Sequence, residues 1–270
     1  MFIQSGVIIW YEQSKTIAYT NSNLAVLFII KKLSMDEVMT LNELNKRLNE
    51  LSEEGHRLYK QAQFPGNPCI GVRTERIQAI AHRIGEQPWK ESLIAQLRAS
   101  NIHEHRLMLG FMIASNRYQS KTEAYIAVTK FVELIINNEV CDQFVSSISH
   151  LVADNRDAYY QLALVQVQSI FPTSIRFGIV MLWYYFVQPD HIREINTAIL
   201  SIRSGHHSVK HALVGLLNEC YSVDHKQLLS FIQNPQLDPW VVNRTISRIV
   251  DSNRLRKPEL DELYLNWRLN

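Results

Sequence analysis

Apolar residues that recur with helical periodicity over nearly the whole chain are the feature that most constrains its fold. In the first such segment, residues 36–61, Val38, Leu41, Leu44 and Leu48 share one helical face while polar residues occupy the other. Only 9 glycines and 8 prolines interrupt the 270 residues, whereas an all-β fold would need many turns. Since no stretch alternates convincingly as a strand, we predict an all-α fold of long helices with short connections.

The expected helices follow one another as in a helical-repeat protein. Successive helix pairs are spaced about 30–45 residues apart, and one such pair cannot bury its apolar face alone. We therefore predict a superhelical solenoid with a concave surface, and a globular multi-helix bundle is the alternative that the pattern leaves open. The expected helices cover residues 36–61, 75–84, 88–98, 103–114, 120–136, a segment around Asp142 that ends near residue 154, 156–170, 174–187, 190–203, 206–220, 224–233, 239–252 and 258–267.

The first 34 residues do not fit this pattern. Their longest apolar run, residues 24–30, is far too short to span a bilayer. The basic pair Lys31-Lys32 follows the run instead of preceding it, and no small-residue cleavage site comes after it, unlike a secretory signal. We interpret residues 1–34 either as a poorly ordered extension or as residues before a start at Met35. Residues 35–270 are expected to form one repeat domain without membrane attachment.

Cysteines and histidines give no sign of a metal or redox site. Cys69, Cys141 and Cys220 are far apart and lack a CxxC spacing, which indicates buried thiols of a reducing, cytoplasmic compartment. His207 and His211 have an i, i+4 spacing that can hold a metal, but no third ligand accompanies them, so we expect surface or groove histidines. No Gly-rich phosphate loop and no GxSxG motif occurs. We predict no metal and no cofactor.

Two further patterns leave alternatives open. Val140 and Phe144 point one face of their helix into a core, and Asp142 lies about 200° around from Val140, where a solvated surface charge is the simplest interpretation. Net charge is only +2, yet residues 200–257 contain eight basic and four acidic residues, with Arg244 and Arg248 on one helical face. These basic residues could form a track for a phosphate backbone or a scattered solvated face. The consecutive aromatics of residues 183–186 surround their helix and are expected mostly in the core.

Several short segments, in order and at similar spacing, carry a resemblance to a known family. They are Ile70-Gly71-Val72-Arg73-Thr74, Glu104 and Arg106 before Gly110, Val140-Cys141-Asp142 before Phe144, Ile175-Arg176-Phe177-Gly178-Ile179-Val180, Ser208-Val209-Lys210, and Asn243-Arg244. Together they resemble the bacterial DNA alkylation repair family, which are alkylpurine DNA glycosylases built from HEAT-like repeats. The resemblance runs from about residue 36 to residue 268.

The resemblance implies a HEAT-like solenoid whose concave, basic face grips duplex DNA, and a monomeric enzyme that hydrolyses the N-glycosidic bond of N3- or N7-alkylated purines. Asp142 falls on the family's catalytic aspartate position, where a carboxylate stabilises positive charge on the deoxyribose and can orient water. The resemblance also implies DNA-binding roles for Arg73, Arg106, Arg176, Lys210, Arg244 and Arg248.

The chain departs from the family pattern around Asp142. Tryptophans are expected at the lesion-proximal positions occupied by Asn138 and Thr173, and at Gly215, and a proline is expected at Glu75. Two alternatives to a glycosylase therefore stay open. One is a catalytically impaired family member that binds DNA without base excision, and the other is a helical-repeat scaffold that binds proteins.

Overall fold

The computed structural model describes residues 2–4, 7–12, 15–20, 39–85 and 90–251. The chain divides into two compact units, residues 1–117 and residues 118–270. Fourteen helices lie in the described residues from 39 onward, which confirms the all-α class there. None of these helices is long and apolar enough to cross a membrane. The expected helix at 258–267 lies outside the described residues, and the solenoid and the single domain over 35–270 stay predictions.

The helices of the first unit follow the predicted ranges with one difference. They are α2 (Leu41–Glu50), α3 (Glu54–Gln63), α4 (Thr74–Gly85), α5 (Lys90–Ala99) and α6 (His103–Ser115). The segment predicted as one helix over 36–61 is two helices, because the backbone becomes extended at Glu53. Helix α6 is buried from His103 to Ala114, and α4 and α5 pack against it. It therefore forms the centre of this unit.

Three short strands, which the sequence pattern did not predict, precede these helices. β1 (Phe2–Gln4), β2 (Val7–Glu12) and β3 (Lys15–Thr20) form an antiparallel sheet in the order β1-β2-β3, with Glu12 opposite Lys15. The composition of β2 could have predicted a strand, because the β-branched and aromatic residues in which it is rich favour strands even without alternation.

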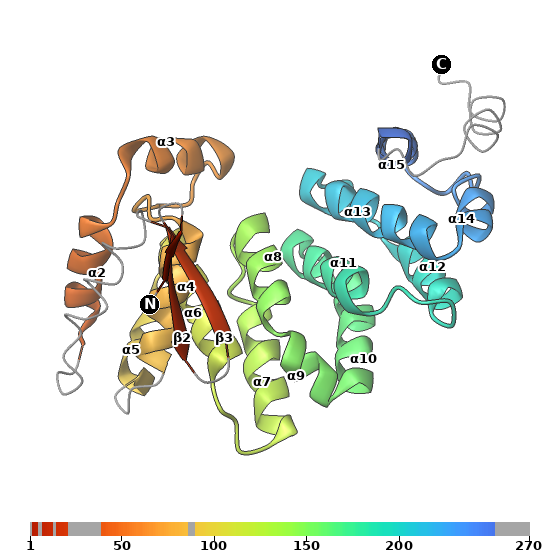
Figure 1. Ribbon diagram of the computed structural model, residues 1–270. Helices are drawn as coiled ribbons and strands as arrows, with labels where there is room; N and C mark the ends of the chain where they lie inside the picture. Colours follow the sequence, from red (N-terminus) through yellow and green to blue (C-terminus); the bar gives the residue numbers. More distant parts are fainter. Residues whose placement is uncertain (1, 5–6, 13–14, 21–38, 86–89, 252–270) are drawn as a thin grey trace. The chain divides into compact units, whose positions relative to one another are not determined.

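The second unit contains nine of the described helices in two rows (Figure 1). They are α7 (Lys121–Val132), α8 (Asn138–Ser147), α9 (Ser149–Asp154), α10 (Arg156–Val167), α11 (Pro172–Tyr185), α12 (Ile192–Ser201), α13 (His207–Val223), α14 (His225–Phe231) and α15 (Pro239–Asp251). In one row α11 packs against α8 and α13, and α13 packs against α15. In the other row α10 packs against α7 and α12, and it also packs against α11.

Three phenylalanines set the position of α8 relative to α11. The ring of Phe144 on α8 lies 4.3 Å from that of Phe131 on α7 and 6.4 Å from that of Phe177 on α11, measured between centroids. All three side chains are almost completely buried, and burial of each contributes about 1.5–3 kcal/mol. Because Phe144 is two residues from Asp142 and Phe177 follows Arg176, this packing brings the aspartate and the arginine together.

Candidate active site around Asp142

Asp142 and Arg176 form a bidentate ion pair between α8 and α11. Arg176 Nε donates to Asp142 Oδ1 at 3.0 Å, and Arg176 Nη2 donates to Asp142 Oδ2 at 2.6 Å. The third nitrogen, Nη1, donates to the backbone carbonyl of Ser208 on α13 at 2.6 Å. One guanidinium therefore links three helices of the same row, and fork-to-carboxylate geometry of this kind fixes orientation as well as charge.

The two partners differ in their access to water. The Arg176 side chain is 9% exposed, whereas the Asp142 side chain is 35% exposed. The carboxylate is thus a negative charge of fixed orientation that a ligand can approach, with its counter-ion behind it. Such a charge can stabilise a cation that develops nearby.

The neighbouring thiol does not offer a second reactive group. Burial of Cys141, followed by the charge of Asp142, raises the pKa of the thiol well above its ordinary value. Because the thiolate is the nucleophilic form, Cys141 stays protonated and unreactive at neutral pH. Its role is to fill the core behind Asp142.

The two expected lesion-proximal positions are on the same helices as the two members of the ion pair. Asn138 precedes Asp142 by one helical turn on α8, and Thr173 precedes Arg176 by almost one turn on α11. Both side chains are half-buried. The chain therefore has small polar side chains, instead of aromatic faces, one turn before Asp142 and almost one turn before Arg176.

An indole occupies the space beside Gly215, the third position where a tryptophan is expected. A Cβ atom at Gly215 on α13 would lie 2.4 Å from Cζ3 and 2.6 Å from Cη2 of Trp183, which comes from α11. The guanidinium carbon of Arg248 on α15 lies 5.8 Å from the centroid of the same ring. The aromatics of residues 183–186 were expected mostly in the core, but only Phe186 is buried, and Trp183 is half-buried against α13. A glycine inside a helix, which leaves room for a neighbouring ring, is the sequence signal for the contact with Trp183.

Gly215→Ala is expected to lower the free energy of unfolding by about 1–3 kcal/mol, because the new methyl group overlaps the Trp183 ring. In a Trp183→Ala background the same change is expected to be neutral or stabilising, since alanine suits a helix interior better than glycine. Urea denaturation of the four proteins measures both effects. Gly205→Ala, where an added Cβ meets open space, is the control. An equal cost with and without the indole would show that Trp183 does not occupy this space.

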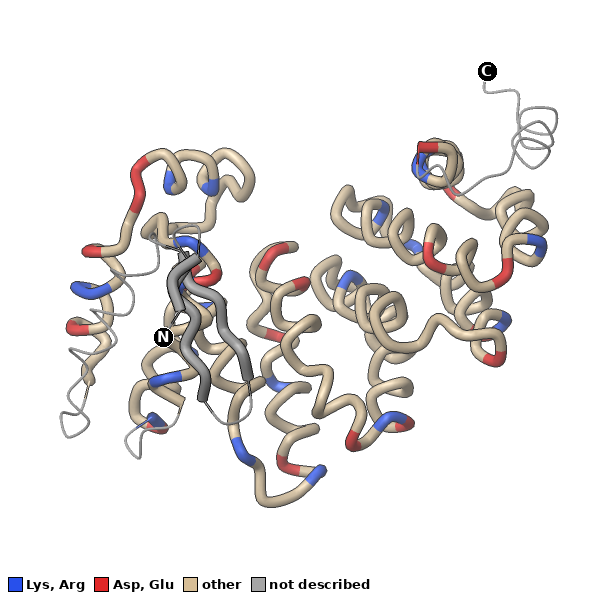
Figure 2. The backbone as a smooth tube through the Cα atoms, in the orientation of Figure 1, with Lys and Arg blue, Asp and Glu red and all other residues tan. Residues whose placement is uncertain are grey.

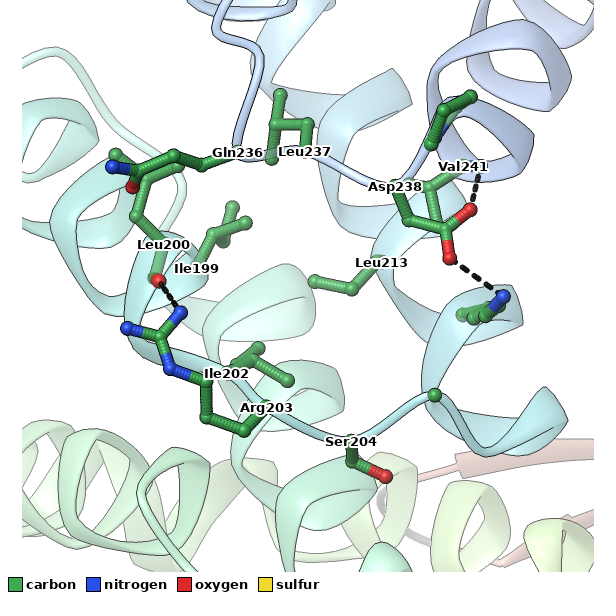
Figure 3. A pocket seen from close by; sticks show the side chains of 13 residues that line it. Ile199, Leu200, Ile202, Arg203, Ser204, Leu213, Gln236, Leu237, Asp238 and Val241 are labelled. Carbon is green, nitrogen blue, oxygen red and sulfur yellow. Dashed lines mark hydrogen bonds and ion pairs between the residues drawn. The ribbon is translucent and has the colours of Figure 1, made fainter.

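Lys210, one of the residues of the second unit expected to bind DNA, forms an ion pair with Asp238. Lys210 Nζ lies 2.6 Å from Asp238 Oδ2, and Asp238 also accepts from the backbone N–H of Trp240 at 2.8 Å at the start of α15. The hydrogen bond from Lys210 lowers the pKa of Asp238. The pair borders a cavity of about 360 Å³ with aliphatic walls that include Leu213 and Val241 (Figure 3). Arg244 and Arg248, in contrast, are exposed on one face of α15, as the spacing predicts.

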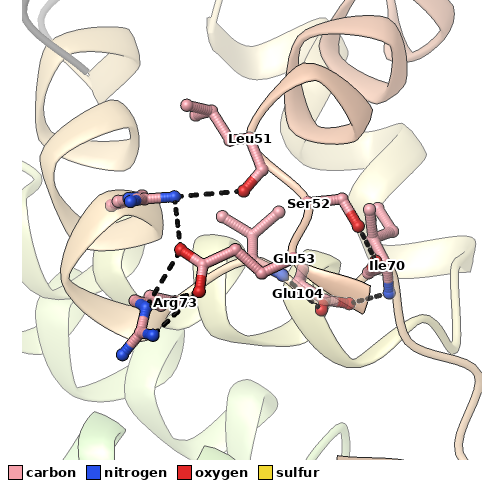
Figure 4. A network of polar contacts seen from close by, with 8 residues as sticks. Leu51, Ser52, Glu53, Ile70, Arg73 and Glu104 are labelled. Carbon is pink, nitrogen blue, oxygen red and sulfur yellow. Dashed lines mark hydrogen bonds and ion pairs between the residues drawn. The ribbon is translucent and has the colours of Figure 1, made fainter. Parts of the chain in front are cut away.

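In the first unit the two expected DNA contacts are engaged elsewhere. The Arg73 side chain is 55% exposed, and its Nε lies 3.0 and 2.9 Å from the two carboxylate oxygens of Glu53, which also pairs with Arg76 (Figure 4). Arg106 is only 8% exposed and donates through Nη1 to the carbonyl of Arg98 at 3.1 Å. Because Arg106 is buried, it suits a structural role better than the expected phosphate contact. Basic and acidic residues are interspersed along the helices of each unit (Figure 2).

Glu104 at the start of α6 binds the segment at residues 70–74, although the two were separate motifs in the sequence. Its carboxylate, which is completely buried, accepts from the backbone N–H groups of Ile70 at 2.8 Å, Gly71 at 2.7 Å and Val72 at 3.3 Å (Figure 4). Gly71 has a φ of 98°, a conformation that side chains other than glycine rarely adopt. The segment at 70–74 and the start of α6 are therefore one structural feature.

A sequence profile of the DNA alkylation repair enzyme family matches residues 44–263, which is most of the chain. The chain belongs to this family. None of the curated proteins with which it was compared matches it. Membership of a family of DNA alkylation repair enzymes supports a role in DNA repair, with DNA as the substrate. The matched range includes Asp142, Arg176 and the exposed arginines of α15. Within the described residues no group of three or more His, Cys, Asp or Glu side chains could hold a metal ion.

Proposed function

We propose that the protein is a DNA glycosylase that hydrolyses the N-glycosidic bond of N3- or N7-alkylated purines in duplex DNA. The observation that carries this proposal is the Asp142 carboxylate, which is held by two hydrogen bonds from Arg176 and is one-third exposed. An alkylated purine already carries positive charge and is a good leaving group. As the bond breaks, positive charge develops on the deoxyribose, and a fixed carboxylate stabilises it and can orient the attacking water.

The remaining residues suit binding and positioning. Arg176 holds the carboxylate in place, and this role fits its burial better than the phosphate contact expected from the sequence. Arg244 and Arg248 are exposed and one turn apart on α15, so they are the residues of the second unit that we assign to phosphate contacts. Contacts of this kind supply affinity without sequence preference.

A second candidate is a family member that binds DNA without excising bases. It is favoured by the small polar side chains of Asn138 and Thr173 at the expected lesion-proximal positions, because aromatic faces that would favour a cationic nucleotide are lacking there. Both candidates share the binding surface and differ only in the chemistry at Asp142.

Base release by the unchanged protein and by Asp142→Asn distinguishes the two candidate functions. The change keeps the shape of the side chain and removes its charge, so release of N7-methylguanine from a duplex is expected to fall by about 10²–10³-fold. The dissociation constant for the same duplex is expected to change by less than about threefold, since Asp142 is not a phosphate contact. Asp190→Asn, which removes an equal charge at an exposed position of the second unit, is the control and should leave release unchanged.

Two results would count against the proposal. Release that persists in Asp142→Asn would remove the aspartate from the mechanism. No release from the unchanged protein, with duplex affinity that falls steeply with salt by a log–log slope of about −0.9 per phosphate contact, would establish the DNA-binding candidate instead.

A further inference from the structure

Two imidazoles of the second unit lie side by side on α13. His207 and His211 are one helical turn apart, with 4.2 Å between their ring centroids and 2.9 Å between their Nε2 atoms. Both side chains are exposed. In the glycosylase proposed above neither histidine has a role, so the pair calls for an explanation of its own.

The separation of the two nitrogens matches the geometry of a metal chelate. An imidazole nitrogen binds a divalent transition metal at about 2.0–2.1 Å. Two such ligands lie about 2.9 Å apart when the angle at the metal is about 90°, and about 3.4 Å apart at the tetrahedral angle preferred by zinc. The observed 2.9 Å therefore fits adjacent positions of a square-planar or octahedral ion, which is the preference of Cu²⁺ and Ni²⁺.

An indole and two arginines lie near the pair. The ring centroid of Trp240 on α15 lies 5.0 Å from that of His211, in an edge-on arrangement, and 6.4 Å from that of His207. Arg176 and Arg244 place positive charge near His211. The same arginines oppose any cation, so only ions with strong affinity for imidazole can bind.

We propose that His207 and His211 form a binding site for Cu²⁺ or Ni²⁺, with water or another ligand at the remaining coordination positions. The pair has no carboxylate or carbonyl ligand of the kind that Mg²⁺ and Ca²⁺ require, so these ions are not accommodated. Without a metal, the same separation suits a hydrogen bond from one imidazole to the other, and the metal ion takes the place of that proton. The site is independent of the proposed glycosylase activity.

Isothermal titration of the full, untagged chain with NiCl₂ tests the proposal without any activity measurement. One Ni²⁺ is expected to bind, and His207→Ala and His211→Ala are each expected to weaken binding at least tenfold because each removes one of two nitrogen ligands. His150→Ala, which removes an exposed histidine from α9, is the matched control and should bind as the unchanged protein does. MgCl₂ should produce no binding heat.

A spectroscopic measurement covers the case in which an alanine variant folds poorly. Electron paramagnetic resonance of the unchanged protein with one equivalent of Cu²⁺ is expected to give the signal of a tetragonal ion with two equatorial nitrogens. Either His207→Gln or His211→Gln should reduce the nitrogen count by one. Absence of Ni²⁺ binding, or binding that both histidine variants retain at full strength, would overturn the proposal.

Discussion

Glu104→Ala is expected to lower the free energy of unfolding of the first unit by about 3–5 kcal/mol. The substitution leaves the N–H groups of Ile70, Gly71 and Val72 without their acceptor, and each buried polar group without a partner costs about 1–3 kcal/mol. It also removes the contact that holds the 70–74 segment against α6. Urea denaturation measures the overall loss, and hydrogen exchange at residues 70–72 localises it.

Two matched variants show whether this cost comes from the backbone contacts of Glu104. Glu104→Gln keeps the shape and one acceptor oxygen, so its cost should be about half that of alanine. Glu50→Ala removes an exposed glutamate from the end of α2 and should leave the unfolding transition unchanged. A Glu104→Ala protein as stable as the unchanged chain, with protected amides at 70–72, would contradict the assigned role.

Arg176→Met is expected to produce the second large effect, on stability and on the proposed base release together. Methionine fills part of the space but removes the donors to Asp142 and to the Ser208 carbonyl. Breaking a buried ion pair from one side costs about 3–5 kcal/mol, and we expect about 2–4 kcal/mol here because water can solvate part of the Asp142 carboxylate. Base release should fall about as far as in Asp142→Asn, since the carboxylate loses its fixed orientation.

A double-mutant cycle distinguishes positioning from a direct phosphate contact. If Arg176 acts through Asp142, the Arg176→Met and Asp142→Asn effects on base release should be far from additive. The salt dependence of duplex binding should then stay the same in Arg176→Met. A log–log slope that becomes shallower by about 0.9 in this variant would instead identify Arg176 as a phosphate contact. Chemical denaturation of the same four proteins measures the stability coupling independently.

Most of the helical architecture could be predicted from the sequence because it is local. The 3.6-residue periodicity and the prolines and capping residues place the ends of most helices within a few residues of those observed, as at Ser120, which accepts from Glu123 N–H before α7. The location of Asp142 away from the buried face of its helix and the shared face of Arg244 and Arg248 follow from the same periodicity. The short strands at residues 2–20 were missed because their apolar residues are consecutive instead of alternating.

The sequence by itself therefore determined the fold class, the repair family and the position of the carboxylate. Only the tertiary structure decided what each charged or aromatic side chain contacts. Asp142 and Arg176 are 34 residues apart, and the burial of Phe144 and Phe177 between α8 and α11 is what brings them together. Tertiary packing likewise places Trp183 beside Gly215 and buries Arg106. The physical reason is that periodicity assigns a residue to a helical face, whereas its partner depends on which other helix packs against that face.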